Sequence, residues 1–377
     1  MKNILITRSG GIGDMLFITP ALNIIRRYFP EAKISILIPS SWVEVFKGNK
    51  DIDQLIENPY RSFSKAASLL SALKSNNFDL LINFDPRNAY DYKDLANELN
   101  INSFWSLIHK DYLPINSNKF NFKGFVWYAW DTNRHYVENY LALLKEAGLD
   151  GDSKELKINI DRKDNDFVDR LLQDFDIGRN DLLVVLHPGT ANTNNKALGI
   201  LFAKIKKAIK IKLPIERRRW PLRYYAELGN LLKREFKCRI VITGSDYEKR
   251  LVKQIQRFTD FEPLDLSGKT TIKQLAALYK KCDIVIASDT GPLHLAAAVG
   301  TPVVGLYGPT EPRHSRPWIE ESRFKVIRSN LKCSPCQHIR TKICLHTECM
   351  YRIKPQEVFG AVKELINTCS QDDKNQF

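Results

Sequence analysis

The sequence is long enough for two domains and is typical of a globular protein. It has 377 residues, of which 44% are hydrophobic and 27% charged, so an ample core can form. The formal net charge of +14 favours anionic partners, and the absence of a zinc-finger, RNP or helix-turn-helix signature argues against nucleic acid. No apolar run approaches the ~20 residues that span a bilayer. The apolar start, Ile4 to Ile6, is too short for a signal peptide, so we expect a cytoplasmic protein.

The start of the chain predicts a strand, a glycine-rich turn and a helix. Residues 3–7 are apolar between polar ends, the turn spans 8–13, and Asp14 opens a helix predicted over 15–28. Further strands are predicted at 33–39 and 79–84. This alternation indicates a parallel sheet with helices on both faces. Asp14 fits two interpretations: a cap of its helix, or a carboxylate held where strand ends collect ligands.

The second half repeats this architecture after a polar stretch. We place the domain boundary at 165/166, and a buried strand is predicted at 182–186, ending in His187-Pro188-Gly189-Thr190. The Thr190 hydroxyl and N–H suit a diphosphate, although Pro-Gly-Thr is also a common turn. The repeat predicts an α/β protein with two Rossmann-like domains, 1–165 and 166–354.

A basic segment follows this turn. Residues 196–219 contain nine Lys or Arg and one acid, and the apolar side chains of 198–213 fall on one face of a helix. Such a helix can lie on an anionic membrane surface, or it can pack on its own domain with its lysines in water. We favour docking on the inner membrane, which makes this segment, 191–216, a candidate membrane anchor.

Two more strands of the second half end in polar turns. The strand predicted at 239–243 leads to Asp246, which could accept hydrogen bonds from a ribose or cap the next helix. The strand 284–287 leads to Ser288-Asp289-Thr290-Gly291 and a short helix from 293, followed by a strand at 301–307 and Gly308-Pro309-Thr310. A helix start with a close glycine suits a phosphate, and His294 in the first turn can reach the same place.

Four blocks of sequence together resemble glycosyltransferase family 9, the ADP-heptose:lipopolysaccharide heptosyltransferases. They occur in the family's order and span nearly the whole chain: Arg8-Ser9-Gly10-Gly11-Ile12-Gly13-Asp14, His187-Pro188-Gly189-Thr190, Arg219-Trp220-Pro221-Leu222, and the run from Asp289 to Thr310. The resemblance implies the GT-B fold, two Rossmann-like domains facing across a cleft. It departs from the family between the second and third blocks, where residues 191–216 are inserted.

The resemblance also implies roles for single residues. Asp14 matches the proposed general base, which takes a proton from the acceptor hydroxyl. Arg218 is the best match to a lysine that contacts donor phosphate, and the swap keeps the positive charge. Thr190, Asp246, Asp289, Thr290, Gly291 and His294 are the other residues expected to bind the donor.

A cysteine cluster lies near the end of the chain. The seven cysteines, an odd number, do not suggest a secreted disulfide scaffold. Four of them form the cluster: Cys333, Cys336, Cys344 and Cys349. Four thiolates can hold structural zinc or iron, or they can pack a loop as reduced thiols. After this cluster, a helix predicted over 355–366 is expected to cross back to the first domain, and the tail to 377 is polar.

The function predicted from these residues and the resemblance is inverting sugar transfer. The donor would be a nucleotide sugar, by resemblance ADP-heptose, and the acceptor a lipid-linked lipopolysaccharide core or related glycan. No cofactor is expected for catalysis. One alternative is the same fold acting on a protein acceptor. Another is a membrane- or nucleic-acid-binding protein without transferase activity. A Rossmann oxidoreductase is disfavoured because Leu16 stands where the third glycine is needed.

Overall fold

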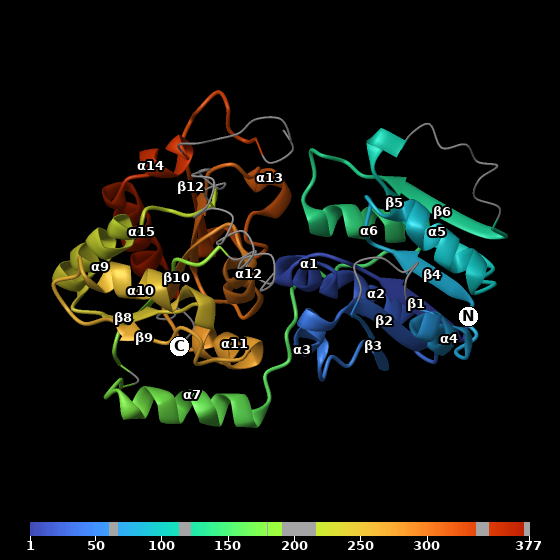
Figure 1. Cartoon of the computed structure of the whole chain (residues 1–377), viewed down its shortest axis with the longest axis horizontal. Coiled ribbons are helices and arrows are strands. Elements are labelled where there is room, and N and C mark those ends of the chain that lie inside the picture. Colours follow the sequence, from blue (N-terminus) through green and yellow to red (C-terminus); the bar gives the residue numbers. More distant parts are fainter. Residues whose placement is uncertain (60–66, 113–121, 179, 191–215, 337–346, 373–377) are drawn as a thin grey trace, which may run out of the picture. The chain divides into compact units, whose positions relative to one another are not determined.

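The chain folds into two units, Met1–Asn159 and Ile160–Phe377, each built on one parallel sheet. The computed structural model describes residues 1–59, 67–112, 122–178, 180–190, 216–336 and 347–372 (Figure 1). The predicted boundary at 165/166 falls inside α7, just after this division. The basic segment 198–213 and Cys344 lie outside the described residues.

The first sheet has six strands in the order β3-β2-β1-β4-β5-β6. Its pairs are all parallel, with Ile4 of β1 opposite Ile34 of β2 on one side and Leu80 of β4 on the other. The strands are β1 (Asn3–Thr7), β2 (Lys33–Pro39), β3 (Gln54–Asn58), β4 (Leu80–Asn83), β5 (Ser103–Ile108) and β6 (Gly124–Ala129).

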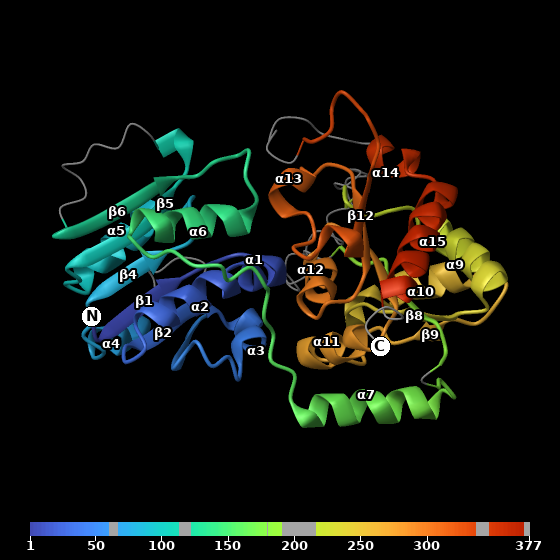
Figure 2. The ribbon, with the colours of Figure 1, turned by 180° about the vertical axis from the view of Figure 1, so that it is seen from behind.

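Helices cover both faces of this sheet, as the alternation of elements predicts (Figures 1 and 2). Side chains of α4 and α5 share a core with Leu5, Leu81 and Phe104, whereas α2 packs beside α6. The helices are α1 (Ile12–Phe17), α2 (Thr19–Tyr28), α3 (Val43–Phe46), α4 (Ala67–Lys74), α5 (Ala89–Glu98) and α6 (Tyr136–Glu146). The single helix predicted over 15–28 is two helices, because Pro20 is the second residue of α2 and cannot continue α1.

The second sheet repeats the same strand order, β12-β11-β10-β7-β8-β9. In each sheet the first strand therefore lies beside the fourth, and the chain order reverses between β1 and β4 and between β7 and β10. Ligands of open α/β sheets bind at such switch points, beyond the carboxyl ends of the strands. The strands are β7 (Leu183–His187), β8 (Arg239–Ile242), β9 (Leu264–Asp265), β10 (Ile284–Ser288), β11 (Val303–Tyr307) and β12 (Phe324–Arg328).

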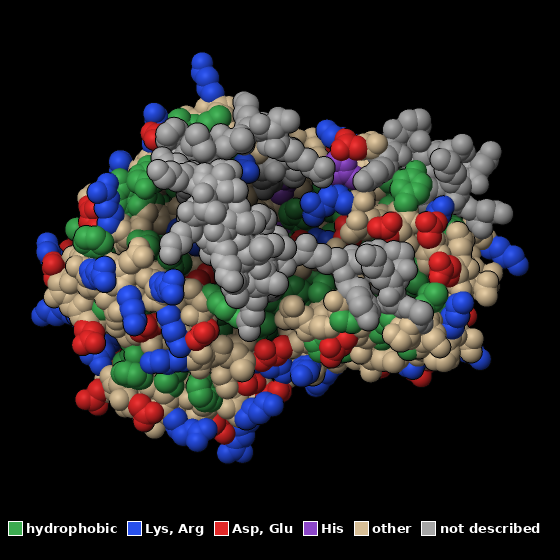
Figure 3. All heavy atoms as spheres, viewed as in Figure 1, with side chains coloured by type: hydrophobic (Ala, Val, Ile, Leu, Met, Phe, Trp, Pro, Cys, Tyr) green, Lys and Arg blue, Asp and Glu red, His purple; other side chains and the backbone are tan. Residues whose placement is uncertain are grey.

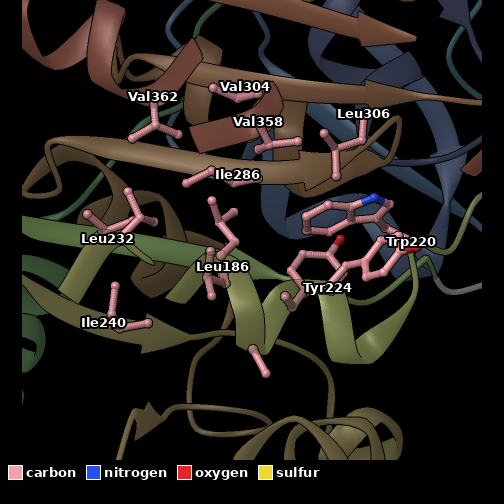
Figure 4. Packing of buried hydrophobic residues seen from close by; sticks show 14 of the residues in the cluster. Leu186, Trp220, Tyr224, Leu232, Ile240, Ile286, Val304, Leu306, Val358 and Val362 are labelled. Atoms are coloured by element: carbon pink, nitrogen blue, oxygen red, sulfur yellow. The ribbon is translucent and has the colours of Figure 1, made fainter. Parts of the chain in front are cut away.

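The core of the second unit lies between this sheet and helices α9, α10 and α15 (Figure 4). On the other side, α11 contacts both α7 and α12. The helices are α7 (Arg162–Asp174), α9 (Leu222–Phe236), α10 (Lys249–Gln256), α11 (Ile272–Lys280), α12 (Gly291–Ala298), α13 (Pro312–Ser315), α14 (Glu348–Arg352) and α15 (Pro355–Asp372). The last helix buries Val358, Val362 and Leu365 in this core, so its apolar face belongs to the second unit.

The segment between the units is fixed to each of them by a specific contact. In the first unit, Thr19 Oγ1 accepts a hydrogen bond of 2.9 Å from the backbone N–H of Lys157. In the second, Lys273 is buried and its ammonium lies 2.8 Å from the carboxylate of Asp161, which precedes α7. The boundary at Asn159 thus falls between two anchored residues.

Basic and acidic side chains are mixed on one face of the second unit (Figure 3). On the face shown in Figure 3, blue Lys and Arg side chains stand over α9 and α10, with acidic side chains among them. Within the described ranges, every helix is too short or too polar to span a bilayer.

Trp220 ties together distant parts of the second core. Its side chain is fully buried, its ring centroid lies 4.8 Å from that of Tyr225, and its Nε1–H donates to the carbonyl of Ile353 at 2.9 Å. In Figure 4 the indole lies beside Tyr224, below Leu306. The surrounding core therefore encloses the indole ring and also supplies a hydrogen-bond acceptor for its N–H.

We expect Trp220→Ala to destabilise the second unit by about 3–5 kcal/mol, the usual cost of emptying a buried aromatic site. Chemical denaturation followed by circular dichroism measures the change. Trp127→Ala is the matched control, since Trp127 on β6 is 41% exposed and should cost much less. Equal losses for the two variants would contradict the proposed role of Trp220.

Candidate functional site

The guanidinium of Arg218 spans the switch point of the second sheet. Its Nη2 donates to the carbonyl of Thr190, after β7, at 3.2 Å, and its Nη1 donates to the carbonyl of Asp289, after β10, at 3.0 Å. Glu216 lies 3.6 Å from Nε, and the Arg218 side chain remains 29% exposed. A partly exposed positive charge is thus held where the ends of two central strands meet.

The position of Arg218 follows from the residues after it. Trp220 is buried in the core and Pro221 directly precedes α9. Because the indole is anchored by packing and by Ile353, the arginine two residues earlier is carried to the edge of the sheet. The block Arg219-Trp220-Pro221-Leu222, one of the four that carried the resemblance, therefore consists of a buried indole followed by the start of a helix.

Asp289 is a buried carboxylate with several partners. His294 Nε2 lies 3.3 Å from Oδ1, and Ser315 Oγ donates to both carboxylate oxygens at 3.2 Å. Burial by itself would raise the pKa of Asp289, but the hydrogen bond and charge of His294, with the charge of Arg218, hold it below its usual value. Asp289 therefore stays ionised and orders the loop after β10.

Thr290, Gly291 and His294 lie in and after this loop. Thr290 precedes α12, and its hydroxyl donates to the carbonyl of Ser288 at 3.1 Å instead of capping the helix. Pro292 has no N–H, and the N–H of Leu293 donates to Thr290. The backbone amides of Thr290 and Gly291 are therefore the groups of this helix start that can meet an anion.

Two buried polar atoms flank Gly189 after β7. Thr190 Oγ1, on the next residue, has no hydrogen-bond partner among the described residues, and neither does Glu248 Oε1. A Cβ on Gly189 would stand 2.3 Å from that Glu248 oxygen, so a larger residue would displace the carboxylate from its present position. Buried polar atoms in proteins are usually hydrogen-bonded, so these two atoms are candidates to bind the polar groups of a ligand.

Glu248 was not predicted from the sequence, because its pattern is that of a helix cap. Its other oxygen, Oε2, accepts from the N–H and the hydroxyl of Ser245 at 2.7 and 2.9 Å. Ser-x-x-Glu is a capping-box spacing, which carries no functional signal of its own. Burial distinguishes Glu248, which is 4% exposed, from an ordinary cap.

Asp246, the acid that the sequence singled out on this loop, lies at the surface. Its side chain is 70% exposed and its carboxylate is 2.7 Å from the ammonium of Lys249. The structure therefore brings Thr190, Arg218, Asp289, Thr290, Gly291 and His294 to the carboxyl ends of β7 and β10, while Asp246 forms an exposed ion pair with Lys249.

His187 ends β7 beneath these groups. Its Nδ1 lies 2.9 Å from Thr243 Oγ1, which in turn lies 3.1 Å from the hydroxyl of Tyr279. Burial lowers the pKa of His187, although the charge of Glu248 acts in the opposite direction. The ring is thus neutral near pH 7 and serves the packing of the strand end.

In the first unit, Asp14 is the third residue of α1 and follows the glycine turn. Its Oδ2 accepts from the N–H of Gly11 at 2.8 Å, and its side chain is 28% exposed. Gly10 has φ +125°, and a Cβ there would stand 2.3 Å from the same carboxylate oxygen. Both interpretations of the sequence are compatible with this geometry, because the carboxylate satisfies the helix start and still reaches solvent.

Arg8 joins Asp14 to a second carboxylate. Its Nη2 hydrogen-bonds Asp14 Oδ1, and its Nη1 lies 3.8 Å from Asp85, which follows β4. The two strands concerned, β1 and β4, form the switch point of the first sheet. Arg8 was not predicted as a site residue, since a charged residue after a strand is most often solvated.

The described cysteines of the cluster are not gathered around one point. Among residues with a described placement, no three His, Cys, Asp or Glu side chains are grouped to hold a metal. Cys336 donates its N–H to Pro309, Cys349 is buried against Gly308, and Cys333 is exposed. A four-thiolate site would also require Cys344, which lies outside the described residues.

Comparison with known proteins agrees with the fold and the motifs. The family model of glycosyltransferase family 9 (heptosyltransferase) matches residues 126–346. Lipooligosaccharide heptosyltransferase 2 of Campylobacter jejuni is 25% identical, over 94% of this chain and 95% of its own. Lipopolysaccharide heptosyltransferase 3 of Escherichia coli is 24% identical, over 94% and 95%.

Solved structures share the arrangement of both sheets. A family 9 glycosyltransferase of Veillonella parvula superposes with a TM-score of 0.76 at 20% identity, covering 97% of each chain. The ADP-heptose heptosyltransferase II of E. coli gives a TM-score of 0.71 at 19% identity, covering 98% of this chain and all of the other. These likenesses confirm the predicted GT-B fold. Because the family model matches more than half of the chain, the protein belongs to glycosyltransferase family 9, the heptosyltransferases, and is a glycosyltransferase.

Proposed function

We propose that the protein moves heptose from ADP-heptose to a lipopolysaccharide core or related glycan, with inversion at the sugar carbon. The relatives named above are lipooligosaccharide and lipopolysaccharide heptosyltransferases, and one of the similar structures is described as an ADP-heptose enzyme. In this proposal the second unit binds the donor, and Asp14 of the first unit is the general base.

The observation that carries the proposal is the set of polar atoms around Gly189. Glu248 Oε1 can accept hydrogen bonds from sugar hydroxyls, and Thr190 Oγ1 can donate to phosphate oxygen. Arg218 adds a positive charge beside Thr190. A nucleoside diphosphate offers hydroxyl donors and anionic acceptors in one ligand, so it satisfies all three groups.

The chemistry is a single displacement. The acceptor oxygen forms a bond to the anomeric carbon while the bond from that carbon to the diphosphate oxygen breaks. Asp14 accepts the hydroxyl proton, and the departing ADP carries the negative charge that Arg218 stabilises. Asp14 can serve because each of its oxygens takes one donor from the described part of the chain, Arg8 or Gly11, which leaves a lone pair for the proton.

The direct test is to offer the protein ADP-, UDP- and GDP-linked sugars with lipopolysaccharide core acceptors and to measure the released nucleotide. We expect release of ADP from ADP-heptose only when acceptor is present. Exclusive release of UDP or GDP would refute the proposed donor, and turnover with a protein acceptor alone would refute the proposed acceptor.

Asp14→Asn should lower turnover by about 10²- to 10⁴-fold, the usual contribution of a general base, while leaving ADP affinity within about twofold. Steady-state ADP release and titration calorimetry measure the two quantities. Asp94→Asn is the control, since that carboxylate is 68% exposed and pairs only with Lys93 among the described ion pairs. Full activity of the Asp14→Asn variant would remove Asp14 from the mechanism.

Glu248→Gln and Gly189→Ala should each weaken ADP binding by about 10- to 100-fold. The first removes a charged acceptor, and such hydrogen bonds contribute about 1.5–3 kcal/mol. The second forces the same carboxylate out of place through a 2.3 Å contact. Gly360→Ala is the matched control, because a Cβ there meets nothing within 4 Å. Unchanged affinity in both site variants would exclude Glu248 from donor binding.

Arg218→Gln should reduce kcat by about 10²- to 10³-fold, the range seen when one group that stabilises developing negative charge is removed. Arg218→Lys should lie between this variant and the parent, since an ammonium keeps the charge but cannot span both strand ends. Arg234→Gln, on a side chain 72% exposed, serves as control in the same kinetic assay. Identical kcat for the parent and the Arg218→Gln variant would show that the leaving group is stabilised elsewhere.

A further inference from the structure

The guanidinium of Arg8 is buried between three groups at the switch point of the first sheet. Only 2% of its side chain is exposed. It hydrogen-bonds Asp14, lies 3.8 Å from Asp85 and stands 5.8 Å from the ring centroid of Tyr140. Burying an arginine destabilises the folded state unless neighbouring groups compensate its charge. The role of each of these neighbours therefore matters.

Asp85 is held in place without help from Arg8. Its Oδ2 accepts from Ser9 Oγ and from Asn88 Nδ2 at 2.9 Å, and its Oδ1 accepts from the N–H of Arg87 at 3.2 Å. These donors fix the carboxylate beside the guanidinium, at a longer distance than the Arg8–Asp14 contact. Arg8 therefore makes its close hydrogen bond to Asp14, and the carboxylate of Asp85 is a second, more distant acidic neighbour.

We infer that Arg8 is a positioning residue that orients the carboxylate of Asp14 for proton transfer, and that Asp85 offsets the charge of Arg8 so that Asp14 remains an effective base. This inference rests on the proposed role of Asp14. With Arg8 donating to Oδ1 and Gly11 to Oδ2, the carboxylate plane has a single orientation. Productive geometry in enzymes depends on such fixing.

The charges around the pair support this division of roles. Burial lowers the pKa of Arg8, but Asp14, Tyr140 and Asp85 together raise it well above the ordinary value, so the guanidinium stays charged. A lone cation at Asp14 would make that carboxylate a weaker base, because an opposite charge favours the ionised form. The negative charge of Asp85 opposes this effect.

Other titratable groups near the pair come from the surrounding elements. Tyr136 and Tyr140 of α6 face Arg8. The helix α3, which packs on α1, carries Glu44, and α2 carries arginines only in its last turn. Among the described residues, Arg8 and Asp85 are the buried charges that ion pairs link to Asp14, so changing either one should alter its behaviour.

The test is the pH dependence of kcat/KM for ADP release from ADP-heptose in Asp85→Asn and Arg8→Lys. The acid limb of this profile reports the essential base of the free enzyme. Without the second negative charge, Asp85→Asn should move the limb to lower pH and reduce the plateau by about tenfold, because Asp14 becomes a weaker base. Arg8→Lys should lower kcat by about 10- to 100-fold with donor KM unchanged, because the charge remains but the orientation is lost.

A third variant gives the opposite shift. Arg8→Met removes the cation and should move the acid limb to higher pH. If this variant does not fold, Asp85→Asn and Arg8→Lys still decide the question. The control is Arg26→Lys, which changes another arginine–aspartate pair of the first unit, with Asp53, and should leave profile and kcat unchanged.

The outcomes separate this inference from the proposed function. If Asp14→Asn is inactive while Asp85→Asn and Arg8→Lys keep the parental profile and kcat, Asp14 remains the base and the positioning role of Arg8 is refuted. If Asp14→Asn retains turnover, the proposed base itself is refuted, and the inference with it. Opposite shifts of the acid limb in Asp85→Asn and Arg8→Met would support the inference, since lost stability alone would not change sign.

Discussion

An arginine spans the switch point of each sheet, and the polar loops of each unit are arranged around it. Arg218 donates to carbonyls beyond β7 and β10, and Arg8 lies between carboxylates beyond β1 and β4. Parallel strands end at one edge, so a long side chain with several donors can connect loops distant in sequence. The two arginines differ in surroundings: Arg8 is buried among acids and suits a structural partner, whereas Arg218 is partly exposed and suits an anionic ligand.

Glycines decide where carboxylates can stand in these loops. Gly10 leaves room for the carboxylate of Asp14, and Gly189 leaves room for that of Glu248. A Cβ on either glycine would collide with a carboxylate oxygen. The two glycines lie after the first strand of their sheets, β1 and β7, whereas Glu248 comes from the loop after β8. The likeness of the two units therefore extends beyond strand order: in each, a glycine after the first strand makes room for an acid.

The strands and the main site motifs could be predicted because their signals are local. Apolar runs such as 3–7 and 33–39 match β1 and β2, and polar turns after strands identified Asp14, Thr190 and Asp289. Glu248 and Arg8 could not be found in this way, since a cap-like acid and a basic residue after a strand have the same local pattern as solvated residues. Their burial is a tertiary property. The break between α1 and α2 at Ile18 was missed although Pro20 signalled it.

The hydrogen bond from Trp220 to Ile353 joins the segment that carries Arg218 to a residue near the C-terminal end of the sequence. The family model ends at residue 346, before Ile353, so a fragment cut at that border would keep every loop around Gly189 and lose the carbonyl that holds the indole. It would also lack Val358 and Val362, which close the core beside β11. Any shortened or split form of this enzyme must therefore retain the last helix, which supplies these core side chains.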